Sequence, residues 1–369
     1  MGQNKLSTVL DYFTSMEDFR VERTKLYPLN EIILLIISSV VSGIENWEEI
    51  QDFGEDELEW LRKYLPYKNG IPSHDTLNRV LSGLCPKKFE ECFMAWTSSL
   101  LPPQVQQHIC IDGKTVRGSK DLSNGKKAIH LINAWSSSFS LCLAQLKQEK
   151  GANEIVSMPK VLEYLELENS IVSIDAIGCQ RAVAQSICSK GGAYILAVKN
   201  NQKELHQDIQ ASFKQFPVKE EFEQVDKGHG RLEIRKCSIL DNLDLISSKS
   251  AWQGLSRIIK IQSSREILST GKKESATRYY ITSLDADAQQ LCRLVRHHWQ
   301  IENQLHWSLD VLFREDLSRK RLDNVAQNFS LIRKIVINLL NLEGSKISKN
   351  RKRHKAARSH KFREKILQF

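Results

Sequence analysis

The stretch from His108 to Phe216 constrains the fold more than any other part of the chain, because strand-like and helix-like runs alternate along it in a definite order. Three apolar, β-rich runs come first, in HICIDG, KAIHLINAWSS and SFSLCLAQLKQE. Helix-like segments then alternate with the strand-like runs SIVSIDA and AYILAVK. Strands in succession followed by alternation predict an α/β fold, with a mixed sheet flanked by helices.

Two of these expected strands end in an acid. Asp112 follows the short run Ile109–Ile111, and Asp175 follows the fourth strand. A single Asp at such a place is more often a helix cap, but two on neighbouring strands would lie close together and repel unless a divalent cation lay between them. Oxygen ligands without a nearby Cys or His set favour Mg²⁺ or Mn²⁺ over zinc, and two such ions promote phosphoryl transfer. This hypothesis requires a third ligand.

Residues 6 to about 100 are expected to be helical throughout. Pro28 and Asn30 precede the apolar run IILLIISSVV and Gly43 follows it, while Ser73 is suited to an N-cap. The run is too short to cross a bilayer, and no signal-peptide pattern opens the chain. The eight cysteines contain no CxxC pair and indicate reduced thiols. We therefore expect a cytoplasmic protein without a membrane partner, nucleoid-associated when bound to DNA. The helical module is compatible with a domain that binds or positions DNA.

The formal charge of +9 is concentrated at the C-terminus. Residues 344–369 contain ten Lys or Arg side chains and one acid, Glu364, so the remainder of the chain is balanced. Such a tail is typical either of an arm that binds phosphates or of a solvated, partly disordered terminus.

Long strings of the sequence resemble one known family. They are YPLNEIILLIISSVVSGIENWEEIQDFG, NGIPSHDTLNRVLSGL, IDGKTVRGS, HLINAW, SIDAIGCQ, YILAVKNNQ, KGHGRLEIRKC and HHWQIENQLHWSLDVLFRED. In this order they resemble the H-repeat-associated insertion-sequence transposases, a DDE group with a ribonuclease H-like core, over nearly the whole chain. The resemblance implies cleavage and strand transfer of double-stranded DNA ends by a homodimer. It also implies that Asp112, Asp175 and Glu302 are catalytic and hold two Mg²⁺ (or Mn²⁺) ions.

Glu302 has weaker support from its own surroundings. Apolar residues recur at helical spacing from Leu291 to Leu309, and Trp299, Glu302 and His306 share one side of that expected helix. Without the resemblance, a Glu at such a position is expected to be an ordinary exposed helix residue. Three other acids are rivals for the third ligand: Asp310, Glu315 and Asp316.

The sequence departs from related transposases around this acid. Those proteins carry Tyr, Arg and Lys in register with the Glu, whereas Val295, His298 and Leu309 occupy these places here. Arg296, His297 and His306 are candidates for part of the missing basic frame, with His298 itself a candidate DNA contact.

Four domains are expected. They are a helical N-terminal domain at 1–103, a ribonuclease H-like core at 104–216 and 285–343, a β-rich insertion at 217–284, and the basic tail at 344–369. The insertion contains GHGRLEIR, in which His229, Arg231 and Arg235 are candidate phosphate contacts. The alternative is an ordinary charged hairpin.

Four further candidates for DNA contact lie near the expected site. Lys114 and Arg117 follow Asp112 closely, although surface charge is an equal alternative. His130 lies on a nearby strand, where a core histidine is equally compatible. Lys199 follows the fifth strand at the edge of the sheet where ligands gather.

The sequence therefore predicts a DDE transposase of a mobile element. In this hypothesis water attacks a phosphodiester at the element's end, and the freed 3′-hydroxyl attacks target DNA. Two alternatives remain: a metal-dependent nuclease without strand transfer, and an inactive DNA-binding remnant.

Overall fold

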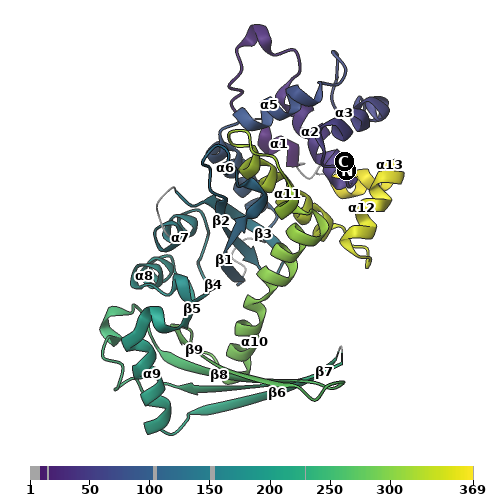
Figure 1. Ribbon diagram of the computed structural model, residues 1–369. Coiled ribbons are helices and arrows are strands. Elements are labelled where there is room, and N and C mark those ends of the chain that lie inside the picture. Colours follow the sequence, from purple (N-terminus) through teal and green to yellow (C-terminus); the bar gives the residue numbers. More distant parts are fainter. Residues whose placement is uncertain (1–8, 15, 103–105, 150–153, 229, 369) are drawn as a thin grey trace, which may run out of the picture.

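The structure is a computed structural model that describes residues 9–14, 16–102, 106–149, 154–228 and 230–368. Nine strands form one sheet: β1 (His108–Val116), β2 (Ile129–Ser136), β3 (Leu141–Lys147), β4 (Ile171–Ile174), β5 (Ala193–Val198), β6 (Glu220–Gly228), β7 (Arg231–Leu240), β8 (Arg257–Ile267) and β9 (Lys273–Thr282). Their order across the sheet is β3-β2-β1-β4-β5-β9-β8-β7-β6 (Figure 1).

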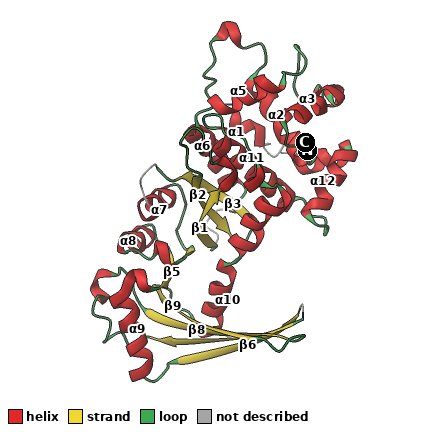
Figure 2. Cartoon of the chain, in the orientation of Figure 1, coloured by secondary structure: helices red, strands yellow, loops and turns green. Residues whose placement is uncertain are grey.

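The first five strands form the mixed sheet that the sequence predicts. Strands β1, β4 and β5 are parallel, while β2 and β3 are antiparallel to their neighbours. The order 3-2-1-4-5 is that of a ribonuclease H-like core. Because the strands are apolar on both faces, helices must cover both. Helices α7 (Glu154–Glu163) and α8 (Arg181–Ser189) lie on one side, and α11 (Val325–Leu342) packs with β3 on the other (Figure 2).

The β-rich insertion continues the core sheet instead of forming a separate one. Strand β9 pairs antiparallel with β5, and β8, β7 and β6 follow as a meander. Helix α9 (Lys203–Gln215) precedes this meander, and α10 (Ala288–His298) follows it and packs on β6 and β7. The chain therefore returns from the insertion to the core along α10.

The N-terminal part is helical, as predicted. Its helices are α1 (Val9–Phe13), α2 (Leu29–Val41), α3 (Trp47–Asp56), α4 (Leu58–Leu61), α5 (His74–Gly83) and α6 (Pro86–Ser99). The side chain of Ser73 caps α5 by accepting a hydrogen bond from the Thr76 amide. In the part of the chain that the structure describes, none of the helices has the length and apolar character needed to span a bilayer.

The basic C-terminal segment is folded, so the alternative of a partly disordered terminus is wrong, while its binding of phosphates stays a prediction. It forms α12 (Lys349–Arg358) and α13 (His360–Leu367), which pack on α2 and α11. Composition misleads here because Lys352, Arg353 and Arg363 are buried and paired with carboxylates, and the partners of the two arginines lie in the N-terminal part of the chain. Arg363 is fully buried, lies 2.9 Å from Glu57, and stacks on an aromatic ring of the N-terminal helices.

Replacing Arg363 by Met should lower the free energy of unfolding by about 1–3 kcal/mol, because the half-buried Glu57 carboxylate loses its arginine and keeps only the contact with His360. Chemical denaturation measures this loss. Lys361→Met, at an exposed position on the same helix, is the matched control and should change stability by less than about 0.5 kcal/mol. Equal effects of the two substitutions would contradict the structural role assigned to Arg363.

Candidate active site

Strands β1 and β4 bring the two aspartates side by side. Their parallel pairing ends at Ile111 and Ile174, so Asp112 and Asp175 are the next residues of adjacent strands. The expectation that Asp112 ends its strand is wrong. Strand β1 continues to Val116, because β2 keeps pairing with it after β4 has ended. Asp112 therefore lies on β1 just beyond the point where its pairing with β4 ends.

Asp175 is held by the loop that follows β4. Its carboxylate accepts a hydrogen bond from the Ile177 amide, 3.1 Å away, and so caps a short 3₁₀ turn. Asn201 and Gln202, which follow β5, donate to the carbonyls of Ala176 and Cys179. The ends of β4 and β5 are thereby tied together around the aspartate.

Glu302 lies in a π-helical segment. The sequence predicts one continuous α-helix, but α10 ends at His298 and is followed by the π-helical turns η6 (Ile301–His306) and η7 (Ser308–Leu312). Such wide turns are rare and occur often at functional sites. In η6, Glu302 Oε2 lies 2.8 Å from Nδ1 of His306, and His306 is buried.

The three acids line one cavity of about 250 Å³. Lys199, Arg278 and Trp299 also border it, and Arg278 lies over the Trp299 ring, 5.4 Å from its centroid. Trp299 is 46% exposed, which is unusual for so large an aromatic side chain. The cavity thus combines carboxylates, cations and an accessible aromatic face.

Burial and mutual repulsion alter the acidity of this site. Burial raises the pKa of Asp112 to about 6, opposed by His306 and reinforced by the charges of Asp175 and Glu302. The hydrogen bond with His306 lowers the pKa of Glu302. Asp112 therefore ionises at a cost that a bound cation would remove.

The donor set fits a divalent cation. Ligand atoms of Asp112, Glu302 and His306 all lie within 4.8 Å of one another, and Asp175 faces the same cavity. Among the described residues, no other group of three His, Cys, Asp or Glu side chains comes as close. Sequence reasoning placed His306 beside Glu302 but assigned it no ligand role. Arg278 was missed altogether, since a lone arginine in a strand carries no local signal.

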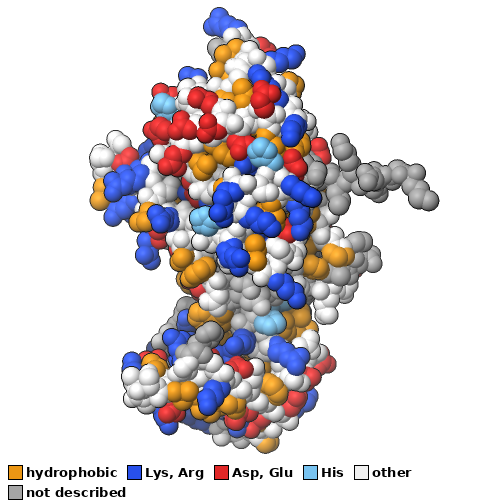
Figure 3. All heavy atoms as spheres, turned by 90° about the vertical axis from the view of Figure 1, so that its right-hand side faces the viewer, with side chains coloured by type: hydrophobic (Ala, Val, Ile, Leu, Met, Phe, Trp, Pro, Cys, Tyr) orange, Lys and Arg blue, Asp and Glu red, His pale blue; other side chains and the backbone are white. Residues whose placement is uncertain are grey.

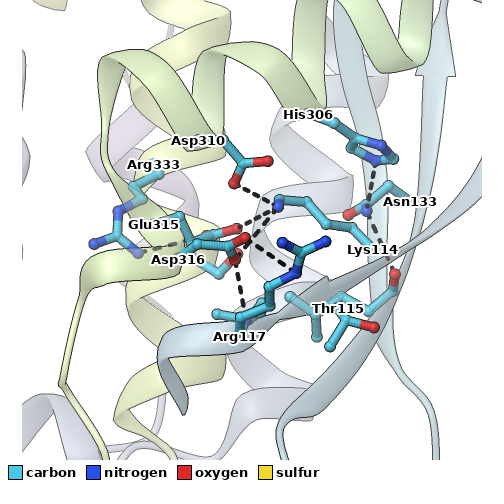
Figure 4. Close-up of polar contacts among 12 residues, drawn as sticks. Lys114, Thr115, Arg117, Asn133, His306, Asp310, Glu315, Asp316 and Arg333 are labelled. Atoms are coloured by element: carbon cyan, nitrogen blue, oxygen red, sulfur yellow. Dashed lines mark hydrogen bonds and ion pairs between the residues drawn. The ribbon is translucent and has the colours of Figure 1, made fainter. Parts of the chain in front are cut away.

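The rival acids lie in a second cluster around Lys114 (Figure 4). The Lys114 amine lies 2.6 Å from Asp310, 3.7 Å from Asp316 and 4.0 Å from Glu315. Lys114 and Glu315 are both buried, and Arg333 pairs with Glu315 from the far side. These acids are therefore neutralised by protein cations, and Lys114 is engaged with them instead of facing solvent.

The loop after β1 packs tightly against this cluster. A Cβ atom at Gly118 would lie 2.2 Å from the Ser318 carbonyl, so only glycine permits the contact. The Arg117 amide donates to Asp316, while its side chain is 81% exposed. Arg117 is thus free to turn toward solvent, unlike Lys114.

Two predicted histidines do not present a cation to the cavity. His130 pairs with Thr115, so it lies on the opposite face of the sheet from Asp112. His298 borders the cavity, but its Nδ1 lies 2.9 Å from the Ser173 hydroxyl. Burial lowers the pKa of His298 to about 4, so it is neutral at pH 7.

The candidates in the insertion are dispersed. Arg231 is exposed at the start of β7, whereas Arg235 forms ion pairs with Asp226 and Glu233. His229 lies outside the described residues. None of the described arginines of this hairpin borders the cavity of the acids, although Arg235 lines a neighbouring groove.

Comparison with known proteins agrees with this geometry. Residues 103–339 match the transposase DDE domain family, and residues 10–97 match the DDE_Tnp_1-associated family. The chain belongs to the DDE transposase family. It is 39% identical to YbfL of Escherichia coli K12, and 38% identical to the protein named "H repeat-associated putative transposase YhhI" of the same organism, with 98% of each chain covered in both cases. A shorter relative, 41% identical over 78 residues, is named "Inactive transposase YbfQ".

Membership of the DDE transposase family implies DNA binding and the use of divalent metal ions. The cavity of this transposase-family protein that Asp112, Asp175 and Glu302 line is the candidate site for such ions. The cluster around Lys114 is a separate feature that ties β1 to the segment after Glu302.

In EDTA, Asp112→Asn should stabilise this transposase-family protein at pH 7.5 and leave its stability unchanged near pH 4. The pKa of Asp112 is raised from 3.8 to about 6, so the folded state loses stability as pH rises through that window. Asn cannot ionise, and we expect a gain of roughly 2–3 kcal/mol above pH 6. Urea denaturation at a series of pH values measures this gain in the free energy of unfolding. Curves of stability against pH that run parallel for the wild type and Asp112→Asn would contradict the prediction.

Lys114→Met should destabilise the fold by about 1.5–3 kcal/mol, because Asp310 and Asp316 lose their shared cation while the buried Glu315 keeps Arg333. Arg117→Met is the control. Its exposed side chain lies 3.6 Å from Asp316, and its loss should cost less than about 1 kcal/mol. A Lys114→Met protein as stable as wild type in urea denaturation would remove this cluster from the account of the fold.

Proposed function

We propose that the protein cleaves DNA at the ends of an insertion-sequence element and joins the freed 3′ ends to target DNA. The observation that carries this proposal is the convergence of Asp112, Asp175 and Glu302, from three distant segments, on one cavity. Divalent ions held by these carboxylates would supply activation of the attacking oxygen and stabilisation of the leaving oxygen. Mg²⁺ is the ion that the family resemblance implies.

The protein's own groups would hold the reacting strand. Lys199 and Arg278 border the cavity and offer positive charge to a phosphate, while Trp299 presents a face on which a base can stack. The neutral His298 and the apolar lining exclude bulk water from one side of the cavity. These groups line the same cavity as the acids, so the phosphodiester would lie between them and the carboxylates.

Two further grooves support a path for DNA, and one of them shares Arg278 and Trp299 with the cavity of the acids. One of about 870 Å³ lies between β7–β9 and α10, and includes Arg265, Arg278 and Arg296. Another of about 1050 Å³ runs from η6 and η7 to the start of α12, and includes Arg314 and Arg319. Asn303 borders both. Figure 3 shows blue Lys and Arg side chains gathered across the middle of one face of the molecule, below an acidic area.

Pairing of the two element ends requires two copies of the protein at one place, so we propose a dimer on DNA. The helical parts at both termini would position the DNA, and the insertion would extend the surface that carries it. Arg117 and Arg231, whose side chains are exposed, are further candidates for phosphate contact.

A second candidate function is DNA binding without strand transfer. It is favoured by the absence of the basic frame around Glu302, where Val295 and Leu309 are buried and His298 is neutral. Incubation with labelled element ends, a target plasmid and Mg²⁺ separates the alternatives. Joined products indicate a transposase, cut ends alone a nuclease, and bound but intact DNA a remnant.

Asp175→Asn should reduce strand joining by at least about a hundredfold, because a charged metal ligand is lost. Asn retains the capping hydrogen bond to Ile177, so the loop should stay folded and DNA affinity should change less than about twofold. Joined product on gels and fluorescence anisotropy measure the two quantities. Asp244→Asn, at an exposed loop position, is the control, and full joining activity in Asp175→Asn would remove this residue from the site.

A further inference from the structure

His306 lies between two of the acidic side chains. Its Nδ1 atom is 2.8 Å from Glu302 Oε2 and 3.7 Å from Asp112 Oδ2. The imidazole is almost fully buried, with 4% of its side chain exposed. The same nitrogen therefore faces both carboxylates, and no turn of the ring is needed to bring it to them.

These separations resemble those around a coordinated ion. Neighbouring ligands of an octahedral ion with bonds of about 2.1 Å lie about 3 Å apart. The distance from His306 to Glu302 already matches such an edge, and the distance to Asp112 exceeds it by less than about 1 Å. A cation that drew the three groups together would need only small side-chain movements.

Asn133 provides an independent observation on the other side of the ring. This residue is fully buried. Its amide nitrogen lies 3.4 Å from His306 Nε2 and 3.5 Å from the Leu131 carbonyl, and its Oδ1 has no hydrogen-bond partner among the described residues. An amide carries an acceptor oxygen and a donor nitrogen, and rotation about its last bond exchanges their places. With the amide turned over, Oδ1 accepts the Nε2 proton, and the lone pair on Nδ1 is left to face the carboxylates. Histidine ligands of metals are commonly oriented by an acceptor in this way.

We propose that His306 Nδ1 is a direct metal ligand together with Asp112 and Glu302, and that this site binds first-row transition ions such as Mn²⁺ in preference to Mg²⁺. Imidazole is a ligand of transition metals, whereas Mg²⁺ is bound through oxygen. The proposal rests on the function proposed above, since it concerns the same site. It replaces the all-oxygen site that the sequence implies by a mixed nitrogen and oxygen site.

The experiment uses the full chain and Mn²⁺ as the probe. Electron spin-echo envelope modulation of bound Mn²⁺ should show coupling to a directly bound ¹⁴N nucleus, and labelling the protein with [¹⁵N]histidine should convert it to a ¹⁵N signal. Calorimetric titration should give an affinity for Mn²⁺ at least about tenfold higher than for Mg²⁺.

His306→Asn separates coordination from mere orientation of Glu302, because the Asn amide still reaches the carboxylate as a hydrogen-bond donor. The nitrogen coupling should vanish and Mn²⁺ affinity should fall about tenfold or more, with Mg²⁺ affinity changed less than about threefold. His130→Asn, on the opposite face of the sheet, should retain the coupling and both affinities.

The outcomes separate this inference from the proposed function. Mn²⁺ that binds in wild type but not in Asp112→Asn, yet shows no nitrogen coupling, overturns the role of His306 and leaves the acidic site in place. Absence of Mn²⁺ binding that depends on Asp112 overturns both proposals.

Discussion

The ion pair between Lys114 and Asp310 fixes the two halves of the site relative to each other. Asp112 and Lys114 lie two residues apart on one face of β1, while Glu302 and Asp310 lie on the same helical segment. The 2.6 Å contact between Lys114 and Asp310 therefore determines how Asp112 and Glu302 approach each other. His306, 2.8 Å from Glu302 and 3.7 Å from Asp112, is a second contact between the same two elements.

The same charged cluster extends into the helical part of the molecule. Arg333 of α11 pairs with Glu315 on one side and with Glu45 on the other, and Glu45 also pairs with Arg353 of α12. These side chains are largely buried, so each charge depends on its partners for stability. The termini and the catalytic sheet are thereby joined through one continuous set of ion pairs, and the helical domain is not an independent appendage.

The features of the fold and of the site that could be predicted are those encoded by residues close together in the sequence. The strand and helix order follows from the periodicity of apolar residues, and β1 and β4 carry their aspartates in that pattern. Glu302 needed the family resemblance, because its own surroundings favour an exposed helix residue. The π-helical turns, the burial of Arg363 and the pairing of Lys114 with Asp310 were not predictable. Each depends on a contact with a segment far away in the sequence, which no local pattern encodes.

The distribution of cations explains why the acids of the cavity remain available. Lys114 emerges two residues after Asp112, yet its amine is held by Asp310 and the acids that follow it. Had it paired with Asp112, the protein itself would have neutralised the site. Instead, burial raises the pKa of Asp112 while its nearest strand cation is directed elsewhere. The fold thus leaves the three carboxylates beside an apolar wall, an arrangement that a divalent cation from solution would neutralise.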